Sequence, residues 1–401
     1  MSKLKVLELF GGIGACSKAL ERLGIDFEIA DYVEIDKYAV KSFNAIHNTN
    51  FEPQDICNWD KNIEIDLLMH GSPCQDFSLS GLQAGGDEGS GTRSSLMYET
   101  IRIVEKIKPK YVVWENVKNL LSKKHVHNFN NYLNKMSEIG YKNYYKILNA
   151  KDYGIPQNRE RVFTISIRND IKIDYKFPIA KPLKLKLKDL IEAYVDEKYY
   201  LSEQAIHGRM ITNYQKYKLE ENCVNGKDIH PTILARFDGA PTLYKEAIPI
   251  TNATKKGYLE AYEGDGIDIS SRMQYHRGNV RKESVQTITT SGGNDRGVVV
   301  SKLPGAYGRN FGSKGKLQDK EYCNTLTASM GMGGGNVPLT STELRIRKLI
   351  PLETWRLMGF DDSDFKKAEL VNTNTQLYKQ AGNSIVVNVL EAILKELLLN
   401  E

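Results

Sequence analysis

The chain has 401 residues, 41% hydrophobic and 26% charged, as is ordinary for a soluble globular protein of two or three domains. Its net charge of +5 is too small to indicate a nucleic-acid partner by itself. No apolar run reaches the ~18 residues of a membrane span, and Glu8 interrupts the apolar run that a signal peptide would need, so we expect no membrane segment. The five cysteines form no CxxC pair, so we expect neither a disulfide framework nor a metal site.

Strand and helix patterns alternate along the first 170 residues. We expect strands at 4–10, 27–33, 65–69, 111–114 and 162–167. We expect helices after the glycine turn at 11–14, ending before Gly24, and at 37–47 and 94–107. This alternation predicts an α/β fold with a mainly parallel, doubly wound sheet.

The composition changes after about Asn169. Residues 171–340 hold 18 of the 32 glycines and carry a net charge of +6, against −1 for the remainder. A strand-and-loop pattern recurs there around Thr287-Ile288 and Thr325-Leu326, which indicates a diverged duplication. We predict a small, loop-rich second domain at 171–340, with the positive excess that a polyphosphate partner requires.

Helical periodicity returns near the end of the chain. We expect a helix at 344–358 and a last helix at about 384–398, whose apolar stripe packs onto the first domain. The first domain would then comprise 1–170 plus 341–401, with the second domain inserted into it.

A glycine turn follows the first predicted strand. Gly12 and Gly14 let backbone N–H groups approach a ligand at the start of the next helix. Glu34 ends the second strand, where an acid can hold ribose hydroxyls, and Asp55 precedes the third strand, where it can meet an adenine amino group. Each signal alone is also typical of a tight turn or a solvated strand end, but together they favour a nucleoside-containing cofactor.

A single cysteine, Cys74, follows the third predicted strand in the segment GSPCQ. Ligand sites of α/β sheets form at this edge, and Pro73 fixes the backbone before the cysteine. Most isolated cysteines are structural, but the polar neighbours of Cys74 do not match a buried apolar pocket. The pattern favours a nucleophile, because a thiolate attacks strongly when nearby positive charge lowers its pKa.

Charged residues lie at the end of the fourth strand and before the last strand of the first domain. Glu115 follows an apolar run, and apolar surroundings would raise its pKa and let it donate a proton to a ring nitrogen. Arg159 and Arg161 alternate, so both can face one site and neutralise a developing negative charge. The alternatives are a solvated glutamate beside a capping Asn116 and a solvated, charged turn.

In this order, the motifs resemble those of the DNA (cytosine-5)-methyltransferase family of bacteria and phages. LELFGGIGA resembles the S-adenosylmethionine turn, SPCQ the nucleophile motif, ENV the carboxylate motif, QNRER the arginine motif and QAGNSIVVNVL the final motif. The resemblance implies a class I S-adenosylmethionine-dependent methyltransferase sheet in the first domain. It also implies that 171–340 is a target recognition domain that binds DNA.

The resemblance implies methyl transfer to C5 of a cytosine flipped out of a specific double-stranded DNA sequence. Cys74 would add to C6, Glu115 would hydrogen-bond or protonate N3, and Arg161 would contact O2. Arg159 and Pro73 would support the cysteine. The methyl group would come from S-adenosylmethionine, and loss of the C5 proton with elimination of Cys74 would release 5-methylcytosine.

The resemblance also assigns binding residues. The cofactor site would be lined by Phe10, Gly12, Gly14, Glu34, Ile35, Asp55, Ile56, Asn383 and Ile385, with Ile35 replacing an aromatic residue often found there. The DNA would be contacted by Ser78, Ser80, Thr287, Thr325 and Leu326. Which copy of the Thr-Leu/Ile pair touches bases stays open. We expect a monomer in the bacterial cytoplasm, at the nucleoid, serving with a cognate restriction endonuclease or as an orphan or phage modification enzyme.

Three other functions compete with this interpretation. A cytosine-C5 methyltransferase of transfer RNA shares the motifs but usually has a smaller insertion than residues 171–340. A catalytically silent DNA-binding protein would not need Cys74, Glu115 and Arg161. An NAD-dependent oxidoreductase would have a third glycine or an alanine at position 17, where this chain has serine.

Overall fold

The structure, a computed structural model of the chain, describes residues 3–73, 93–200, 247–255, 257–269, 278–290, 296–301, 305–307, 317–318, 340–341 and 344–399. The chain divides into two compact units. The first unit comprises Met1–Ile191, Thr287–Gly293 and Ile350–Glu401, and the second comprises Glu192–Gln286 and Asn294–Leu349.

The first unit extends further than the sequence predicts. It continues to Ile191, beyond the expected boundary at 170. The ring of Tyr175 packs edge-on against Tyr144, and the N–H of Lys181 donates to the carbonyl oxygen of Asp152 at 2.9 Å. These contacts hold the segment after residue 170 against the first unit.

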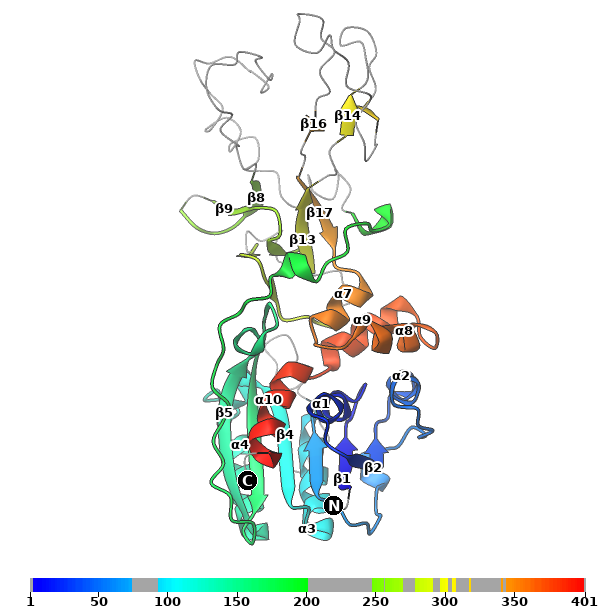
Figure 1. The fold of residues 1–401 in the computed structure, drawn as a ribbon. Coiled ribbons are helices and arrows are strands. Elements are labelled where there is room, and N and C mark those ends of the chain that lie inside the picture. Colours follow the sequence, from blue (N-terminus) through cyan, green and yellow to red (C-terminus); the bar gives the residue numbers. More distant parts are fainter. Residues whose placement is uncertain are drawn as a thin grey trace, which may run out of the picture. The chain divides into compact units, whose positions relative to one another are not determined.

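A six-stranded sheet forms the centre of the first unit (Figure 1). Its strands, in spatial order, are β2 (Phe27–Val33), β1 (Leu4–Leu9), β3 (Leu67–His70), β4 (Tyr111–Val117), β7 (Glu160–Arg168) and β5 (Tyr141–Asn149). The first four are parallel, and β7 is antiparallel to both of its neighbours. The predicted α/β sheet, mainly parallel, is therefore confirmed.

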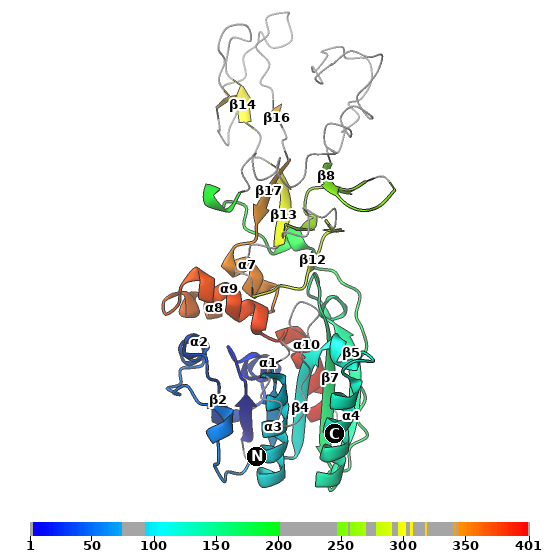
Figure 2. The same ribbon diagram turned by 180° about the vertical axis from the view of Figure 1, so that it is seen from behind.

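Helices cover both faces of this sheet. Figures 1 and 2 show α1 (Ala15–Leu23) and α10 (Val387–Leu398) on one face, and α3 (Met97–Ile107) and α4 (Val126–Ile139) on the other. The large core beneath α3 and α4 includes Leu68, Val112 and Trp114, each at most 1% exposed. Helix α4 and strand β5 are not among the elements predicted from the sequence.

The remaining helices of the first unit flank the sheet. Helix α2 (Lys37–His47) follows β2, and α7 (Pro351–Arg356), α8 (Asp362–Glu369) and α9 (Asn374–Asn383) precede α10. Short 3₁₀ helices include η1 (Ile56–Asn58), η2 (Arg93–Leu96), η3 (Lys118–Leu121), η4 (Ala150–Tyr153) and η5 (Leu187–Asp189), and β6 (Gln157–Asn158) precedes β7. The predicted return of the last helix onto the first domain is confirmed, because α10 packs against α1.

The described residues of the second unit form short strands and the 3₁₀ helix η6 (Glu197–Tyr199). An antiparallel sheet has the order β11 (Val280–Arg281), β10 (Gly266–Asp268), β13 (Arg296–Ser301) and β17 (Leu344–Lys348). Strands β8 (Ile248–Thr251) and β9 (Tyr258–Ala261) form a hairpin, and β14 (Gly305–Tyr307) pairs with β15 (Leu317–Gln318) and β16 (Thr340–Ser341). Strand β12 (Val285–Gln286) ends directly before the segment that belongs to the first unit.

The helix expected at 344–358 was wrong in its first half. Residues Leu344–Lys348 are strand β17, which pairs along its whole length with β13. The sequence LRIRK alternates apolar and basic residues, which suits a strand, and α7 begins only at Pro351, a residue favoured at a helix start. None of the helices in the described ranges is both long and apolar enough to cross a membrane.

Candidate active site at the carboxyl edge of the sheet

The glycine turn after β1 leaves an open cradle of backbone. Phe10, Gly12 and Gly14 have left-handed φ angles of 53°, 56° and 81°. The Tyr32 hydroxyl donates to the Gly12 carbonyl oxygen at 2.7 Å and fixes the turn. A Cβ added at Gly12 would meet no atom within 4 Å, so the space above this residue is open. The turn can therefore accept a ligand against its backbone.

Glu34 lies beside this turn. Its carboxylate accepts hydrogen bonds from the N–H of Gly12 at 3.2 Å and of Asp36 at 2.9 Å. Burial raises the pKa of Glu34, although these two N–H donors act to lower it. The next residue, Ile35, is 69% exposed, so its apolar side chain is free to contact a flat ring.

Asp55 and Ile56 differ in what they offer a ligand. Asp55 caps η1, accepting a hydrogen bond from the Cys57 N–H at 3.0 Å. Ile56 packs into the main core with a side chain only 4% exposed, so only its backbone can reach a ligand.

The C-terminal segment reaches the same edge of the sheet. Asn383 ends α9 and is exposed. The Ile385 side chain lies 3.5 Å from the position of a Cβ at Gly71, directly after β3. The segment after α9 thus lies beside the segment that follows β3.

Glu115 and Arg161 form an ion pair across neighbouring strands. Arg161 Nε lies 3.0 Å from Glu115 Oε1, and the two side chains are only 17% and 11% exposed. Both residues line a small cavity with Arg159, together with Leu148, Ala150, Phe163, Ile385, Val386 and Val389. Apolar side chains line the cavity beside Glu115, as expected from the sequence, and a guanidinium that the sequence does not predict there lies directly against its carboxylate.

Arg159 binds backbone carbonyls from two distant segments. Its guanidinium, in a residue 4% exposed, donates to the carbonyl oxygens of Ser384 at 2.7 Å, Gly382 at 3.2 Å and Ile288 at 3.2 Å. It therefore joins the arginine motif to the final motif.

Thr287 lies in the first unit rather than the second. Its hydroxyl donates to the carbonyl oxygen of Asn158 at 3.1 Å, and the N–H of Ile288 donates to Gln157 Oε1 at 3.0 Å. The amide nitrogen of the same side chain, Gln157 Nε2, donates to the carbonyl oxygen of Leu357 at 2.7 Å. The Thr287-Ile288 copy of the Thr-Leu/Ile pair is thus held by hydrogen bonds to the arginine motif.

Several predicted site residues lie outside the described ranges. These are Cys74, Ser78, Ser80, Thr325 and Leu326. Pro73 is described and is half-buried at the end of the segment that follows β3.

The residues that anchor this segment are not among the site residues predicted from the sequence. Trp114 Nε1 donates to Ser72 Oγ at 3.0 Å, and Asn116 Nδ2 donates to the Ser72 carbonyl oxygen at 3.3 Å. The available signal was the alternation of β4, which turns Trp114 and Asn116 to one face and Glu115 to the other.

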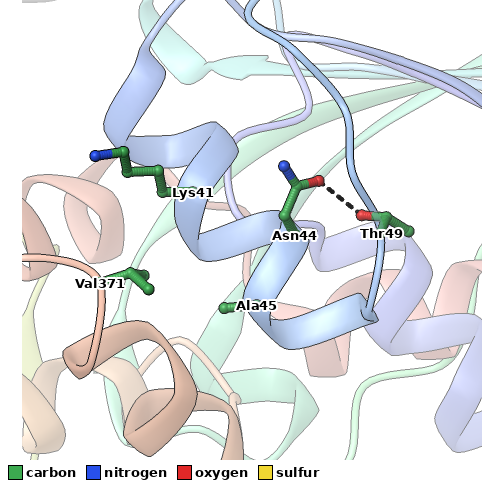
Figure 3. A pocket seen from close by; sticks show the side chains of 5 residues that line it. All are labelled: Lys41, Asn44, Ala45, Thr49 and Val371. Carbon is green, nitrogen blue, oxygen red and sulfur yellow. Dashed lines mark hydrogen bonds between the residues drawn. The ribbon is translucent and has the colours of Figure 1, made fainter.

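A larger hollow lies beside α2 (Figure 3). Its volume is about 490 Å³, and it is lined by Lys41, Asn44, Ala45, Thr49 and Val371. Inside it, Thr49 Oγ1 donates to Asn44 Oδ1 at 2.8 Å. It contains none of the predicted site residues, so we place the site at the smaller cavity beside Glu115. Within the described part of the chain, no cluster of three His, Cys, Asp or Glu residues could hold a metal ion.

The chain is similar to known proteins over its whole length. The family model for C-5 cytosine-specific DNA methylase matches residues 4–399. The orphan methyltransferase M.SPRI of Bacillus phage SPR is 33% identical over 463 residues, covering 99% of this chain and 98% of the relative. Type II methyltransferase M2.ScrFI of Lactococcus lactis subsp. cremoris is 31% identical over 449 residues, covering 98% and 99%.

Solved structures confirm the fold class. An Entamoeba histolytica methyltransferase matches with a TM-score of 0.58 at 15% identity, covering 100% of this chain and 99% of that chain. A DNMT2 mutant of Spodoptera frugiperda matches with a TM-score of 0.58 at 18% identity, covering 98% and 99%.

Proposed function

Because the chain belongs to the C-5 cytosine-specific DNA methylase family and is a DNA cytosine-5 methyltransferase, we propose how its own residues carry out the reaction. The methyl group passes from S-adenosylmethionine to C5 of a cytosine flipped out of a specific double-stranded sequence. The reaction runs through a covalent bond between Cys74 and C6. The observation that carries this proposal is the Glu115–Arg161 pair, 3.0 Å apart, at the sheet edge where β3 leads into Cys74.

The residues at the glycine turn fit S-adenosylmethionine. Gly12 offers open space above its backbone, Glu34 places a carboxylate beside it, and Ile35 exposes an apolar side chain. In this assignment Glu34 holds the ribose, Ile35 contacts the adenine, and Asp55 and the Ile56 backbone meet its edge. Phe10, Gly14, Asn383 and Ile385 complete the site. When bound, the cofactor supplies an electrophilic methyl group on a sulfonium.

Glu115 and Arg161 act together on the cytosine ring. Cys74 as a thiolate adds to C6, and the electron pair displaced from the C5–C6 bond makes C5 nucleophilic. Glu115 binds N3 and Arg161 binds O2, so negative charge that develops on the ring is stabilised where it forms. After C5 is methylated, its proton leaves and the Cys74–C6 bond breaks, which regenerates the thiolate and releases 5-methylcytosine.

Arg159 supports this site through the backbone. Its bonds to Gly382, Ser384 and Ile288 hold the final motif beside the cavity that Glu115 lines. Pro73 restricts the backbone before Cys74. Both residues therefore orient groups that react rather than react themselves.

Residues 171–340 bind the DNA in this proposal. They carry the positive excess of the chain, with a net charge of +6, which neutralises phosphates. Ser78, Ser80 and Thr287, which belong to the first unit, contact the duplex, as do Thr325 and Leu326 of the second unit. The enzyme acts as a monomer on the bacterial nucleoid, as the partner of a restriction endonuclease or as an orphan or phage enzyme.

Bisulfite sequencing of DNA from cells that express the protein tests the proposal. We expect one short sequence to be methylated at cytosine C5 with the native chain and none with Cys74→Ala. A duplex with 5-fluorocytosine at the target should trap a covalent adduct on Cys74, because fluorine cannot leave as a proton does. Full methylation by Cys74→Ala would contradict the mechanism, and methylation of RNA alone would contradict the substrate.

A further inference from the structure

Ser72 lies two residues before Cys74 and is held in place by β4. It is 4% exposed and lies in the short segment between β3 and Cys74. The Trp114 indole N–H donates to its hydroxyl oxygen at 3.0 Å. The Asn116 side-chain amide donates to its carbonyl oxygen at 3.3 Å and reaches its hydroxyl oxygen at 3.4 Å.

The groups that hold Ser72 are themselves fixed. Trp114 is 1% exposed. Its ring plane makes an angle of 4° with that of His70, and its ring centroid lies 4.1 Å from that of Tyr132. Asn116 Oδ1 accepts a hydrogen bond from the Val117 N–H at 2.8 Å, which sets the orientation of the amide. Burial lowers the pKa of His70 to about 3, so the imidazole beside Trp114 stays neutral.

The same strand carries the carboxylate of the reaction. Because side chains alternate along a strand, Glu115 projects to the face opposite Trp114 and Asn116. There it pairs with Arg161 at 3.0 Å. Of three consecutive residues of β4, Glu115 thus supplies the reacting carboxylate, while Trp114 and Asn116 bind the backbone segment that leads to the nucleophile.

We propose that Ser72 is a positioning residue: its hydroxyl and carbonyl oxygens accept hydrogen bonds from Trp114 and Asn116, which orients the backbone that leads to the nucleophile. This inference rests on the proposed function, since it needs Cys74 as nucleophile. These hydrogen bonds affect the geometry with which the thiolate attacks C6, so they influence the covalent step and not the binding of DNA or S-adenosylmethionine.

Three variants separate positioning from simple stability. Ser72→Ala removes the acceptor, Trp114→Phe removes the donor and keeps an aromatic ring, and Ser72→Thr keeps the hydroxyl while adding a methyl group. We expect the first two to lower kcat by about 10- to 100-fold, because small displacements of reacting groups cost this much. Both should leave KM for DNA and cofactor unchanged and slow formation of the 5-fluorocytosine adduct by the same factor.

Ser72→Thr gives the sharpest contrast. Its extra methyl group must fit a buried site, so we expect a lower unfolding temperature than in the native enzyme but a native kcat. Ser166→Ala is the matched control, since Ser166 is 1% exposed and its hydroxyl donates to Asn143 Oδ1 at 2.6 Å on β5. The control should lose stability and keep kcat.

Two results would overturn the inference. One is a kcat that follows the unfolding temperature across all four variants, which would give Ser72 a purely structural role. The other is a native rate of adduct formation in Ser72→Ala and Trp114→Phe. A native enzyme that forms no adduct at all, or an active Cys74→Ser, would instead overturn the proposed function itself.

Discussion

A buried carboxyl group lies beneath the glycine turn. Glu8 on β1 is 2% exposed and accepts hydrogen bonds from the N–H of Ser17, at 3.0 Å, and from its hydroxyl. Burial raises the pKa of Glu8 above its ordinary value of 4.5, while Ser17 and His47 act to lower it. The ionised form is therefore less favourable in the folded protein than in the unfolded chain.

Glu8→Gln should be more stable than the native protein, by an amount that grows as the pH rises. Below pH 4.5, the ordinary value, glutamate is protonated in both states, so the native and variant free energies of unfolding should lie close together. Above pH 4.5, the native protein becomes less stable relative to the variant, until the pH passes the raised pKa of the folded state. The free energy of unfolding falls by about 1.4 kcal/mol for each pH unit between the unfolded and folded pKa values. Urea titrations of both proteins between pH 4 and 8 measure this difference, and an advantage of the variant that shrinks with rising pH would contradict the prediction.

The Glu115–Arg161 pair makes a second prediction at the residue scale. Arg161→Met should lower the free energy of unfolding by about 3 to 5 kcal/mol, because it leaves a buried carboxylate without its partner. The double variant Arg161→Met/Glu115→Gln should regain most of that loss, although both variants should lack methyltransferase activity. Denaturant unfolding checks both, and equal losses in the single and double variants would contradict the pairing.

At the residue scale the motifs predict which side chains lie near one another, while their chemical roles stay predictions. Glu115 and Arg161 were selected from their order and their places at strand ends, and the structure brings them together. Their direct pairing was missed, because the cross-strand register of β4 and β7 depends on tertiary contacts. The contact of Trp114 with Ser72 was missed for the same reason, since 42 residues separate the two.

Helices α1 and α8 are joined by buried charges. Lys18 Nζ lies 2.8 Å from Asp361 and 2.9 Å from Asp364, and the side chains of Lys18 and Asp364 are 10% and 5% exposed. Asp361 is also the N-cap residue of α8. The lysine thus connects the helix after the glycine turn to the C-terminal helices.

Lys18→Met should loosen α8 in particular. We expect a loss of about 3 kcal/mol in the free energy of unfolding, because Asp364 would be buried without its partner. Hydrogen exchange should quicken in α8 more than in α4, which packs on the other face of the sheet. Lys18→Met/Asp364→Asn should restore part of the loss; exchange that quickens evenly in both helices would argue against a local role.

Elements with clear periodicity were predictable from sequence, and those with mixed signals were not. Strands β1, β2 and β3 and helices α1, α2 and α3 follow the expected ranges closely. Strand β17 was taken for a helix because a five-residue run is too short to distinguish the two periods. Its partner β13 decides its conformation.

The charge distribution of the whole molecule leads to a salt-dependence prediction. Lys282 is exposed in the basic insertion. If it contacts a phosphate, Lys282→Gln should reduce the slope of log binding constant against log salt by about 0.9 and weaken binding to all sequences alike. Lys395→Gln, an exposed lysine on α10, is the matched control and should leave the slope unchanged. A loss confined to one target sequence would show that Lys282 reads bases instead.

The insertion itself was visible from composition, but its boundaries were not. Glycine content and charge located a second domain near 171–340. The segment Thr287–Gly293 returns to the first unit because Gln157, Asn158 and Arg159 bind its backbone and hydroxyl groups. Such contacts follow from three-dimensional packing, and no compositional change marks them in the sequence.

The packing of α1 against the C-terminal helices α8 and α10 has a consequence for synthesis in the cell. Lys18 leaves the ribosome 346 residues before Asp364, its partner. At about 5–20 residues per second, the ribosome needs roughly 20 to 70 s to supply that partner. During this interval the sheet face that α10 later covers stays open, so the growing chain should bind chaperones and be cut by proteases until α10 has been synthesised. An incomplete chain should therefore be removed before it can occupy DNA without methylating it.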